Sequence, residues 1–313
     1  MVDRTWVFLD YNQAESRVVA WKGPVPKLKK WYSEGVDVHS YVCQAIAKVV
    51  QENKIPMPPI TQVIDGISRS VEMFKWKPWA EYTKGVEERE MSKRIVHGSN
   101  YDMSFKKLAL ILGVSEETAK ILHKIYMTLF PEIKTNYQVG IERTLRETRT
   151  LIIPDPVKFR IVFQDINSYT PIDPETLRSA YSRYAQATVG GLLNRAFDEA
   201  ASVFAKDENE EYKEQWCVWY GKENWDDWRY RRMHGLRDPK TILQGGMDIR
   251  LNVHDAGGIS TPHDSDIIKW TITKWKEWAE VPVKIGSGNE LIIPVETKVG
   301  KTWGSEDLKD FKL

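Results

Sequence analysis

The chain has 313 residues, of which 42% are hydrophobic, and a formal net charge of +1 at pH 7. This length is enough for one or two domains with a sizeable core, and the near-neutral charge excludes a globally basic surface for nucleic acid while leaving room for a local basic groove. The sequence has two cysteines, no signal-peptide pattern and no apolar run near the roughly 18 residues of a membrane helix, so we expect a cytoplasmic protein, in the host cytoplasm if the source is viral.

The first predicted element is a strand over residues 4–10. Thr5 to Leu9 is an apolar, β-prone run that stops at Asp10, and residues 14–21 are predicted to begin a helix. An aspartate at the end of a strand is most often a turn or cap residue. Asp10 therefore points to a site only if other chemically active residues lie near it.

The following segments are predicted to be mostly helical. Helices are expected over residues 37–50, 86–112, 115–130, 132–147 and 176–204, with a proline-rich loop at 56–59 and short strands at 151–153 and 161–163. Gly113 ends the long helix 86–112, and Ser115, followed by two glutamates, is a good N-cap for the next one.

Four functional side chains recur at every fourth position of the long helix, namely Arg89, Lys93, His97 and Tyr101. Each step of four residues turns only about 40° around a helix and rises roughly 6 Å, so the four form one slowly turning stripe. Two cations, an imidazole and a phenol in that order suit a nucleoside triphosphate, with its phosphates against the cations. The alternative is a solvated helix face, since charges at this spacing are common.

A second predicted strand is also followed by an aspartate, which strengthens the case that Asp10 belongs to a functional site. Asp248 to Val253 alternates apolar and polar residues, as a half-buried strand does, and is followed by His254 and Asp255. Two strands that each deliver an aspartate at their end can make a carboxylate pair, which suits Mg²⁺ and a bound phosphate. Together with the cationic stripe, this pair favours phosphoryl-transfer chemistry over two unrelated turn residues.

Residues from about 205 to 245 form a Trp-rich insertion with an acidic start. Its aromatic residues are Trp216, Trp219, Tyr220, Trp225, Trp228 and Tyr230, interleaved with or followed by arginines. Such aromatics can form a local core, anchor a protein partner or stack on nucleic-acid bases. The sequence leaves these three interpretations open.

Several of these segments, taken in order, resemble the motifs of a known family, the A-family DNA polymerases, which include bacterial DNA polymerase I and many phage replicative enzymes. The stretch with Asp10, Gln13, Glu15 and Arg17 is similar to the first catalytic motif of the family. Arg89, Lys93 and Tyr101 resemble the second motif, Val253 to Asp255 the third, and Arg178, Ser182 and Gln186 a further motif. The stretch from Val295 to Trp303 resembles the strand and tail that end these enzymes.

Four residues depart from the pattern of the family. His97 stands where Phe or Tyr is usual, Ala256 where Glu is usual, Ser182 where Asn is usual, and Asp102 where Gly is usual. The two aspartates, the Arg and Lys of the second motif and Glu15 are present. Their presence favours a catalytically competent protein over an inactive relative.

The resemblance implies an α+β fold, a right-hand polymerase core with an antiparallel palm sheet and helical fingers, expected here without thumb and exonuclease domains. Residues 1–36 and 171–313 would form the palm, with the Trp-rich insertion in the second part, and residues 37–170 the fingers. The strand over residues 4–10 is expected to lack its usual preceding neighbour and so to leave an unpaired sheet edge for a partner to cover.

The resemblance also implies a reaction, which is template-directed DNA synthesis in DNA replication by two-metal nucleotidyl transfer. Asp10, Asp255 and the backbone carbonyl of Tyr11 would bind two Mg²⁺ ions, and Lys93 would be catalytic beside the two aspartates. Nucleotide contacts would come from Arg89, Lys93, His97, Tyr101, Gln13 and Glu15, with Glu15 crowding the 2′ position of the sugar. Primer–template DNA contacts would come from Arg178, Gln186, His254 and Arg17.

Three functional hypotheses follow. The first is the catalytic subunit of a split, phage-type DNA polymerase, whose second protein subunit carries the thumb and possibly an exonuclease. The second is a single-subunit RNA polymerase relative, against which Glu15 argues because a gate against 2′-hydroxyls would be self-defeating. The third is a non-catalytic interaction subunit derived from a polymerase, against which Asp10 and Asp255 argue.

Overall fold

A computed structural model describes most of the chain. It covers residues 4–55, 57, 60–64, 67–71, 74–83, 87–166, 170–205, 210–220, 248–253, 256–286, 290–302 and 307–311. His254 and Asp255, and the Trp-rich insertion from 221 to 247, lie outside the described residues.

The centre of the molecule is a five-stranded antiparallel sheet with the strand order β11-β10-β1-β7-β6. Its strands are β1 (Arg4–Tyr11), β6 (Asp248–Val253), β7 (Ala256–Pro262), β10 (Val295–Gly300) and β11 (Lys309–Asp310). Strand β1 alternates between buried and half-buried residues, so it turns one face to the core and the other to the candidate site. The sheet takes its strands from both ends of the chain, and the proposed domain boundaries stay predictions.

The expectation of an unpaired edge at β1 is wrong. Strand β1 lies in the middle of the sheet and pairs antiparallel with β7 on one side and with β10 on the other. The C-terminal stretch supplies β10 and thereby covers the edge that the sequence interpretation left open. The sheet around Asp10 is therefore complete within the described part of this chain.

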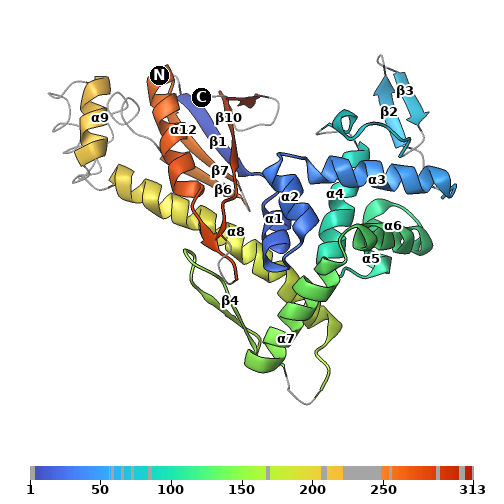
Figure 1. Ribbon diagram of the computed structural model, residues 1–313. Helices are drawn as coiled ribbons and strands as arrows, with labels where there is room; N and C mark the ends of the chain where they lie inside the picture. The colour runs from blue at the N-terminus through green and yellow to red at the C-terminus, as the bar shows by residue number, and fades with distance from the viewer. Residues whose placement is uncertain are drawn as a thin grey trace.

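Two helices cover one face of the sheet, as Figure 1 shows: α8 (Pro174–Ala205) and α12 (Ser265–Ala279). The rings of Phe197 on α8 and Trp275 on α12 pack 5.5 Å apart between their centroids. A Cβ atom on Gly257 of β7 would lie 2.6 Å from the Phe197 ring. Glycine at this position therefore lets the aromatic pair press directly against the strand.

The helices between Ala14 and Thr148 form a second region beside the sheet, coloured blue to green in Figure 1. They are α1 (Ala14–Lys22), α2 (Pro26–Ser33), α3 (Val38–Glu52), α4 (Glu87–Asn100), α5 (Phe105–Leu112), α6 (Glu116–Leu129) and α7 (Val139–Thr148), with a π-helical stretch at Ile133–Gln138 and a short 3₁₀ helix at Trp79–Glu81. Buried aromatic side chains such as Tyr126 and Phe130 fill the space between them. No helix of the described residues is long and apolar enough to cross a membrane.

The long helix predicted over residues 86–112 is in fact two helices. Helix α4 ends at Asn100, Asp102 adopts a left-handed φ of 54°, and Ser104 caps α5 by accepting a hydrogen bond from the Lys107 amide. Side chains that cap a helix compete with its continuation, so Ser104 begins a new helix instead of extending the old one. Tyr101 consequently lies in the turn after α4, and the stripe of four side chains is three on the helix and one beyond it.

Several short elements complete the fold. The hairpin β4 (Thr150–Ile152) and β5 (Arg160–Val162) agrees with the two predicted short strands to within one residue. Helix α2, the hairpin β2 (Ile60–Ile64) and β3 (Ile67–Val71), and the pair β8 (Val283–Lys284) and β9 (Glu290–Leu291) were not predicted. Within the Trp-rich insertion, α9 (Glu210–Tyr220) holds Trp216 with only 3% of its surface exposed, which favours the local-core interpretation for this residue.

Candidate active site

A cavity of about 810 Å³ lies between the sheet and the helical region. Its walls come from the end of β1, from α1, from the start of α3, from α4 and from β10. The predicted site residues that line it are Asp10, Tyr11, Gln13, Glu15, Arg17, Arg89, Lys93 and His97. The fold thus gathers into one cavity side chains that are up to 87 positions apart in the sequence.

The sheet supplies two carboxylates to this cavity. Asp10 near the end of β1 pairs directly with Glu296 of β10, and both line the cavity. Residues directly opposite each other in an antiparallel pair share a face, with Cβ atoms about 4.5–5.5 Å apart. Glu296 also accepts a hydrogen bond from the Asn12 side chain. The sequence interpretation did not select Glu296, although it placed the residue on a closing strand.

Carboxylate oxygens are the donors that Mg²⁺ prefers, so Asp10 and Glu296 fit a magnesium site at this end of the cavity. The predicted third member, Asp255, lies outside the described residues, as does His254. The residues that the structure describes contain no group of three or more His, Cys, Asp or Glu side chains that could hold a metal ion.

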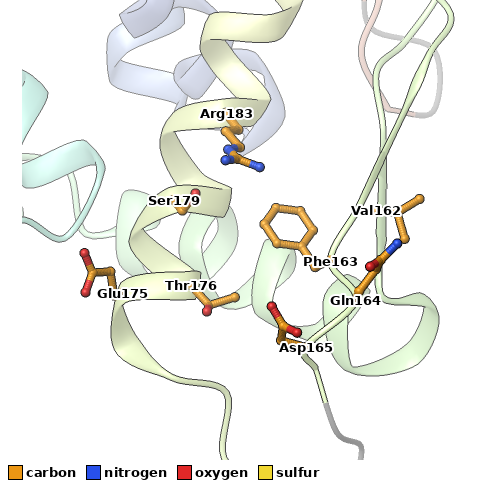
Figure 2. A pocket seen from close by; sticks show the side chains of 8 residues that line it. All are labelled: Val162, Phe163, Gln164, Asp165, Glu175, Thr176, Ser179 and Arg183. Carbon is orange, nitrogen blue, oxygen red and sulfur yellow. The ribbon is translucent and has the colours of Figure 1, made fainter.

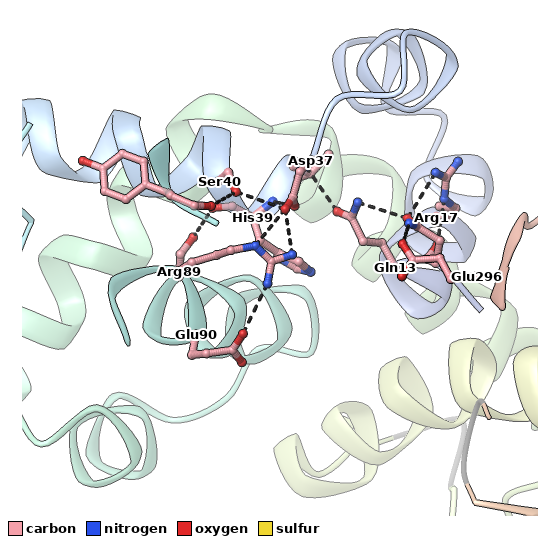
Figure 3. A network of polar contacts seen from close by, with 12 residues as sticks. Gln13, Arg17, Asp37, His39, Ser40, Arg89, Glu90 and Glu296 are labelled. Carbon is pink, nitrogen blue, oxygen red and sulfur yellow. Dashed lines mark hydrogen bonds and ion pairs between the residues drawn. The ribbon is translucent and has the colours of Figure 1, made fainter. Parts of the chain in front are cut away.

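Helix α4 supplies the cations. The Nε and Nη2 atoms of Arg89 each lie 2.7 Å from Oδ2 of Asp37, and Nη1 lies 3.2 Å from Oε1 of Glu90 (Figure 3). Asp37 also caps α3 by accepting a hydrogen bond from the His39 amide. Burial raises the pKa of the Asp37 carboxyl, but the hydrogen bond and charge of Arg89 bring that pKa below its ordinary value. Arg89 therefore joins α4 to α3.

Lys93 differs from Arg89 one turn earlier on the same helix. It is exposed and lines the cavity. Among the described residues, no carboxylate lies within ion-pair distance of its ammonium group. Lys93 is thus the cation on α4 that lines the cavity without a carboxylate partner among the described residues.

Glu15 of α1 contacts side chains from α4 and α8 and from the turn after α4. It accepts a hydrogen bond from the Tyr101 hydroxyl, lies 3.6 Å from Nδ1 of His97, and receives a further hydrogen bond from Gln186 of α8. Burial raises the pKa of the Glu15 carboxyl, but these bonds and the charge of His97 outweigh it, so the pKa lies below the ordinary value. Tyr101 lies outside the cavity lining and is connected to it through Glu15.

His39 is a cavity residue that sequence reasoning missed. It is 2% exposed, and its ring stacks on His97 with centroids 5.9 Å apart. Burial lowers the pKa of His39 well below the ordinary value, and the charge of His97 lowers it further. Among the described residues, Nδ1 of His39 has no hydrogen-bond partner. Buried polar atoms are rarely left without one, so this nitrogen is suited to meet a ligand.

Two of the predicted site residues, Arg17 and Gln13, stabilise the loop after β1. Arg17 is 8% exposed, donates from Nε to the Asn12 carbonyl at 2.9 Å, and places its guanidinium 4.4 Å from the centroid of the Tyr32 ring. Gln13, at a left-handed φ of 48°, accepts a hydrogen bond from the Val38 amide at 3.2 Å. These contacts fix the start of α1 against α2 and α3 and leave little of Arg17 accessible.

The two predicted DNA-contacting residues on α8 are Arg178 and Gln186. Neither lines the cavity, and Gln186 connects to it through Glu15. Gln186 is exposed and Arg178 is half-buried. They lie eight residues apart on α8 and therefore about 80° apart around the helix, on adjoining sides.

A smaller cavity of about 360 Å³ lies at the N-terminal part of α8, as Figure 2 shows. Its features are the Arg183 guanidinium, 5.9 Å from the centroid of the Phe163 ring, and the carboxylates of Asp165 and Glu175. It receives no residue of β1 or α4. The cavity between β1 and α4 is therefore the better candidate for a chemical site.

Comparisons with known proteins place the fold. No protein-family model matches the chain, and no curated protein matches it in sequence. Among solved structures, the chain is similar to the POL domain of Pol1 from M. smegmatis, determined in complex with DNA primer-template and dNTP, with a TM-score of 0.59 and 18% sequence identity. The match covers 96% of this chain and 40% of that one, so the chain spans well under half the length of its structural neighbour. The described helices and antiparallel sheet thus have the fold of a polymerase domain.

Proposed function

We propose that the chain catalyses template-directed DNA synthesis, adding nucleotides from dNTPs to a primer 3′-hydroxyl. The observation that carries this proposal is the single cavity in which strand-end carboxylates of the sheet lie opposite the cations of α4. A triphosphate needs cations for its oxygens and a metal site for the reacting phosphate, and this cavity has cations and two carboxylates that fit these needs. The similarity of the fold to a polymerase domain supports the same conclusion.

Asp10, the backbone carbonyl of Tyr11 and Asp255 are proposed to hold two Mg²⁺ ions, with Glu296 as an additional carboxylate beside Asp10. When bound, the ions would supply charge neutralisation at the transferring phosphate and activation of the attacking hydroxyl. The loss of one ligand is expected to remove several kcal/mol of transition-state stabilisation.

The cations of α4 and the two histidines are proposed to hold the nucleotide. Lys93, exposed in the cavity, would contact the phosphates and could protonate the leaving group. Arg89 would join it by exchanging part of its contact with Asp37 for phosphate oxygens. The unpartnered Nδ1 of His39 offers a further contact to the triphosphate, and His97 would lie near the sugar.

Glu15 is proposed to select the sugar. Its carboxylate is fixed by Tyr101, His97 and Gln186, so it cannot easily move aside to admit a 2′-hydroxyl. Tyr101 would lie near the nascent base pair. This arrangement favours a DNA polymerase over an RNA polymerase relative, and a test of dNTP against NTP use separates the two.

Primer–template DNA is proposed to contact Arg178, Gln186 and His254, with Arg17 acting mainly as a brace because of its burial. A second protein subunit carrying a thumb also stays a proposal. Since β1 is paired on both sides, the sheet gives no support for such a partner at that edge. Extension assays with and without candidate partner proteins test it.

The decisive experiment compares primer extension by the wild-type chain and by Asp10→Asn, with dNTP binding measured in parallel by calorimetry. We expect Asp10→Asn to lose extension by at least about a thousandfold, or roughly 4 kcal/mol, while it folds normally. Asp266→Asn, an exposed residue in the first turn of α12, is the matched control. Extension by Asp10→Asn within about tenfold of wild type, or a wild-type chain that neither extends primers nor binds dNTP, would contradict the proposal and favour the non-catalytic alternative.

A further inference from the structure

A third cavity, of about 670 Å³, lies under the β4–β5 hairpin. Its lining comes from the last residue of α1, the hairpin, Tyr184 of α8 and the segment that contains β8. It shares no lining residue with the candidate active site. Tyr184 and Gln186 are two residues apart on α8, and therefore about 200° apart around the helix. The hairpin cavity thus lies on the side of α8 turned away from Glu15.

The lining of this cavity is strongly cationic. It contains Lys22, Lys158, Arg160 and Lys284 but only one carboxylate, Asp155. Asp155 lies 2.9 Å from the ammonium of Lys158 and so balances one of the four positive charges. Among the described residues, the other three cations have no carboxylate within ion-pair distance.

Lys22 is the most informative of these cations because it is half-buried and packs on an aromatic ring. Its ammonium lies 4.9 Å from the centroid of the Tyr184 ring, a cation–π contact. Burial lowers the pKa of Lys22. An ammonium withdrawn from water without an anionic partner is unfavourable, and an anion in the cavity would relieve this cost.

Backbone hydrogen bonds and close packing fix the hairpin that forms one wall of the cavity. The Lys284 amide donates to the Asp155 carbonyl at 3.0 Å, and the Ile153 amide donates to the Phe159 carbonyl at 2.8 Å. On the other side, Val157 of the hairpin packs so closely on α8 that a Cβ atom at Gly191 would lie 2.1 Å from it. The hairpin is therefore fixed to both α8 and β8, and the site is formed before any ligand arrives.

We propose that this cavity binds single-stranded nucleic acid through its phosphates, outside the candidate active site. Proteins that bind single strands combine a basic groove with aromatic and apolar surface against which bases stack. Here the hairpin presents Phe159, 41% exposed, and Ile152, 68% exposed, beside the cations. A small free phosphate would contact only the cations, whereas a nucleic acid would also contact the apolar side chains of the hairpin. The proposal goes beyond the proposed activity and does not depend on it.

The test is fluorescence anisotropy of a labelled 20-nucleotide oligo(dT) with the full chain at several salt concentrations. Arg160→Gln/Lys284→Gln removes two exposed cations without touching the core, and Lys106→Gln/Lys269→Gln removes two exposed cations elsewhere. We expect the cavity variant to bind oligo(dT) about tenfold more weakly, and its slope of log affinity against log salt to be smaller by about 1.4. The control variant should stay within twofold of wild type, with unchanged thermal midpoints for both.

Two further arms identify the site and the ligand. An oligonucleotide that carries 5-iododeoxyuridine should crosslink to the peptide with Phe159, and less in the cavity variant. Pyrophosphate and dTMP titrations measure whether a free anion binds instead. Equal oligo(dT) affinity in the cavity and control variants, no crosslink to the hairpin, or an effect of the cavity variant on free anions alone would each overturn the proposal. Retained dNTP binding in the cavity variant separates its failure from failure of the proposed function.

Discussion

The cavity between β1 and α4 and the cavity under the β4–β5 hairpin differ in how their charges are balanced. In the cavity between β1 and α4, carboxylates and cations face each other, and Arg89 is already held between Asp37 and Glu90. In the hairpin cavity, four cations surround one carboxylate. A mixed set of charges on fixed neighbours can orient a ligand, whereas a set of similar cations attracts phosphates without ordering them. This difference supports the two proposals, of chemistry in the first cavity and of nucleic-acid binding in the second.

The largest difference in activity is expected between two single substitutions, one in each cavity. Lys93→Gln should lower kcat/KM for dNTP incorporation by about a hundredfold, or roughly 2.7 kcal/mol, because it removes the α4 cation that lines the cavity without a described carboxylate partner. Arg160→Gln should leave kcat/KM within about twofold. Steady-state extension kinetics and oligo(dT) anisotropy on both variants provide the measurement. If Lys93→Gln weakened oligo(dT) binding as much as it weakened catalysis, the two cavities would not have separate roles.

Glu296→Gln tests whether the Glu296 carboxylate contributes to metal binding beside Asp10. The change keeps the acceptor for Asn12 but removes the charge opposite Asp10. We expect extension to fall about tenfold, roughly 1.4 kcal/mol, and the Mg²⁺ concentration for half-maximal activity to rise several-fold. Binding of Mn²⁺, followed by electron paramagnetic resonance, should weaken in parallel. Glu290→Gln, an exposed carboxylate on β9, is the control, and an equal effect of the two substitutions would remove Glu296 from the site.

Glu15→Ala tests the sugar selection of the active cavity. Removal of the carboxylate opens space beside His97 and Tyr101, so the preference for dGTP over GTP should fall about tenfold. Glu15→Gln, which keeps the volume, should fall less. The ratio of kcat/KM for the two nucleotides is the measurement. An unchanged ratio in Glu15→Ala would make Glu15 a structural carboxylate that fixes Tyr101.

The smallest expected effect concerns pH. His39 is buried with a lowered pKa, so the unfolded chain takes up a proton at about pH 6.5 while the folded chain does not. Stability should therefore decrease as the pH falls below about 6.5. Half-buried His123, whose pKa partial burial also lowers, adds to this loss. The lowered pKa values of Glu15 and Asp37 add a further loss only below the ordinary carboxyl range.

His39→Gln should reduce the change in thermal midpoint between pH 7 and pH 5, measured by calorimetry. A pH dependence identical in His39→Gln and wild type would mean that His39 is already accessible to protons in the folded chain.

Much of the fold followed from the sequence because its signals are local. The apolar run before Asp10, the cap at Ser115 and the helical segment predicted over residues 176–204 correspond to elements that the structure contains. The break after Asn100 was missed, although Ser104 is itself a capping residue, because the four-residue repeat continues through it. The pairing of β1 was also missed, since strand partners far apart in sequence leave no local signal.

The site was predictable in part for the same reason. The four-residue spacing selected Lys93, the end of a predicted strand selected Asp10, and the resemblance to a polymerase motif selected Glu15. The structure places all three in the lining of one cavity. Sequence reasoning could not identify His39, whose approach to His97 depends on how α3 crosses α4. It also did not identify Glu296, which reaches Asp10 only through the β1–β10 register. The cationic hairpin cavity combines four segments, none of which is distinctive alone.

The most direct test of the proposed site is anomalous diffraction from crystals of this chain grown with Mn²⁺ and a dNTP. The expected result is Mn²⁺ density beside the Asp10 and Glu296 carboxylates, with the triphosphate against Lys93 and the sugar near Glu15. Mn²⁺ and nucleotide bound elsewhere, or a nucleotide in this cavity with its triphosphate directed away from α4, would contradict the assignment.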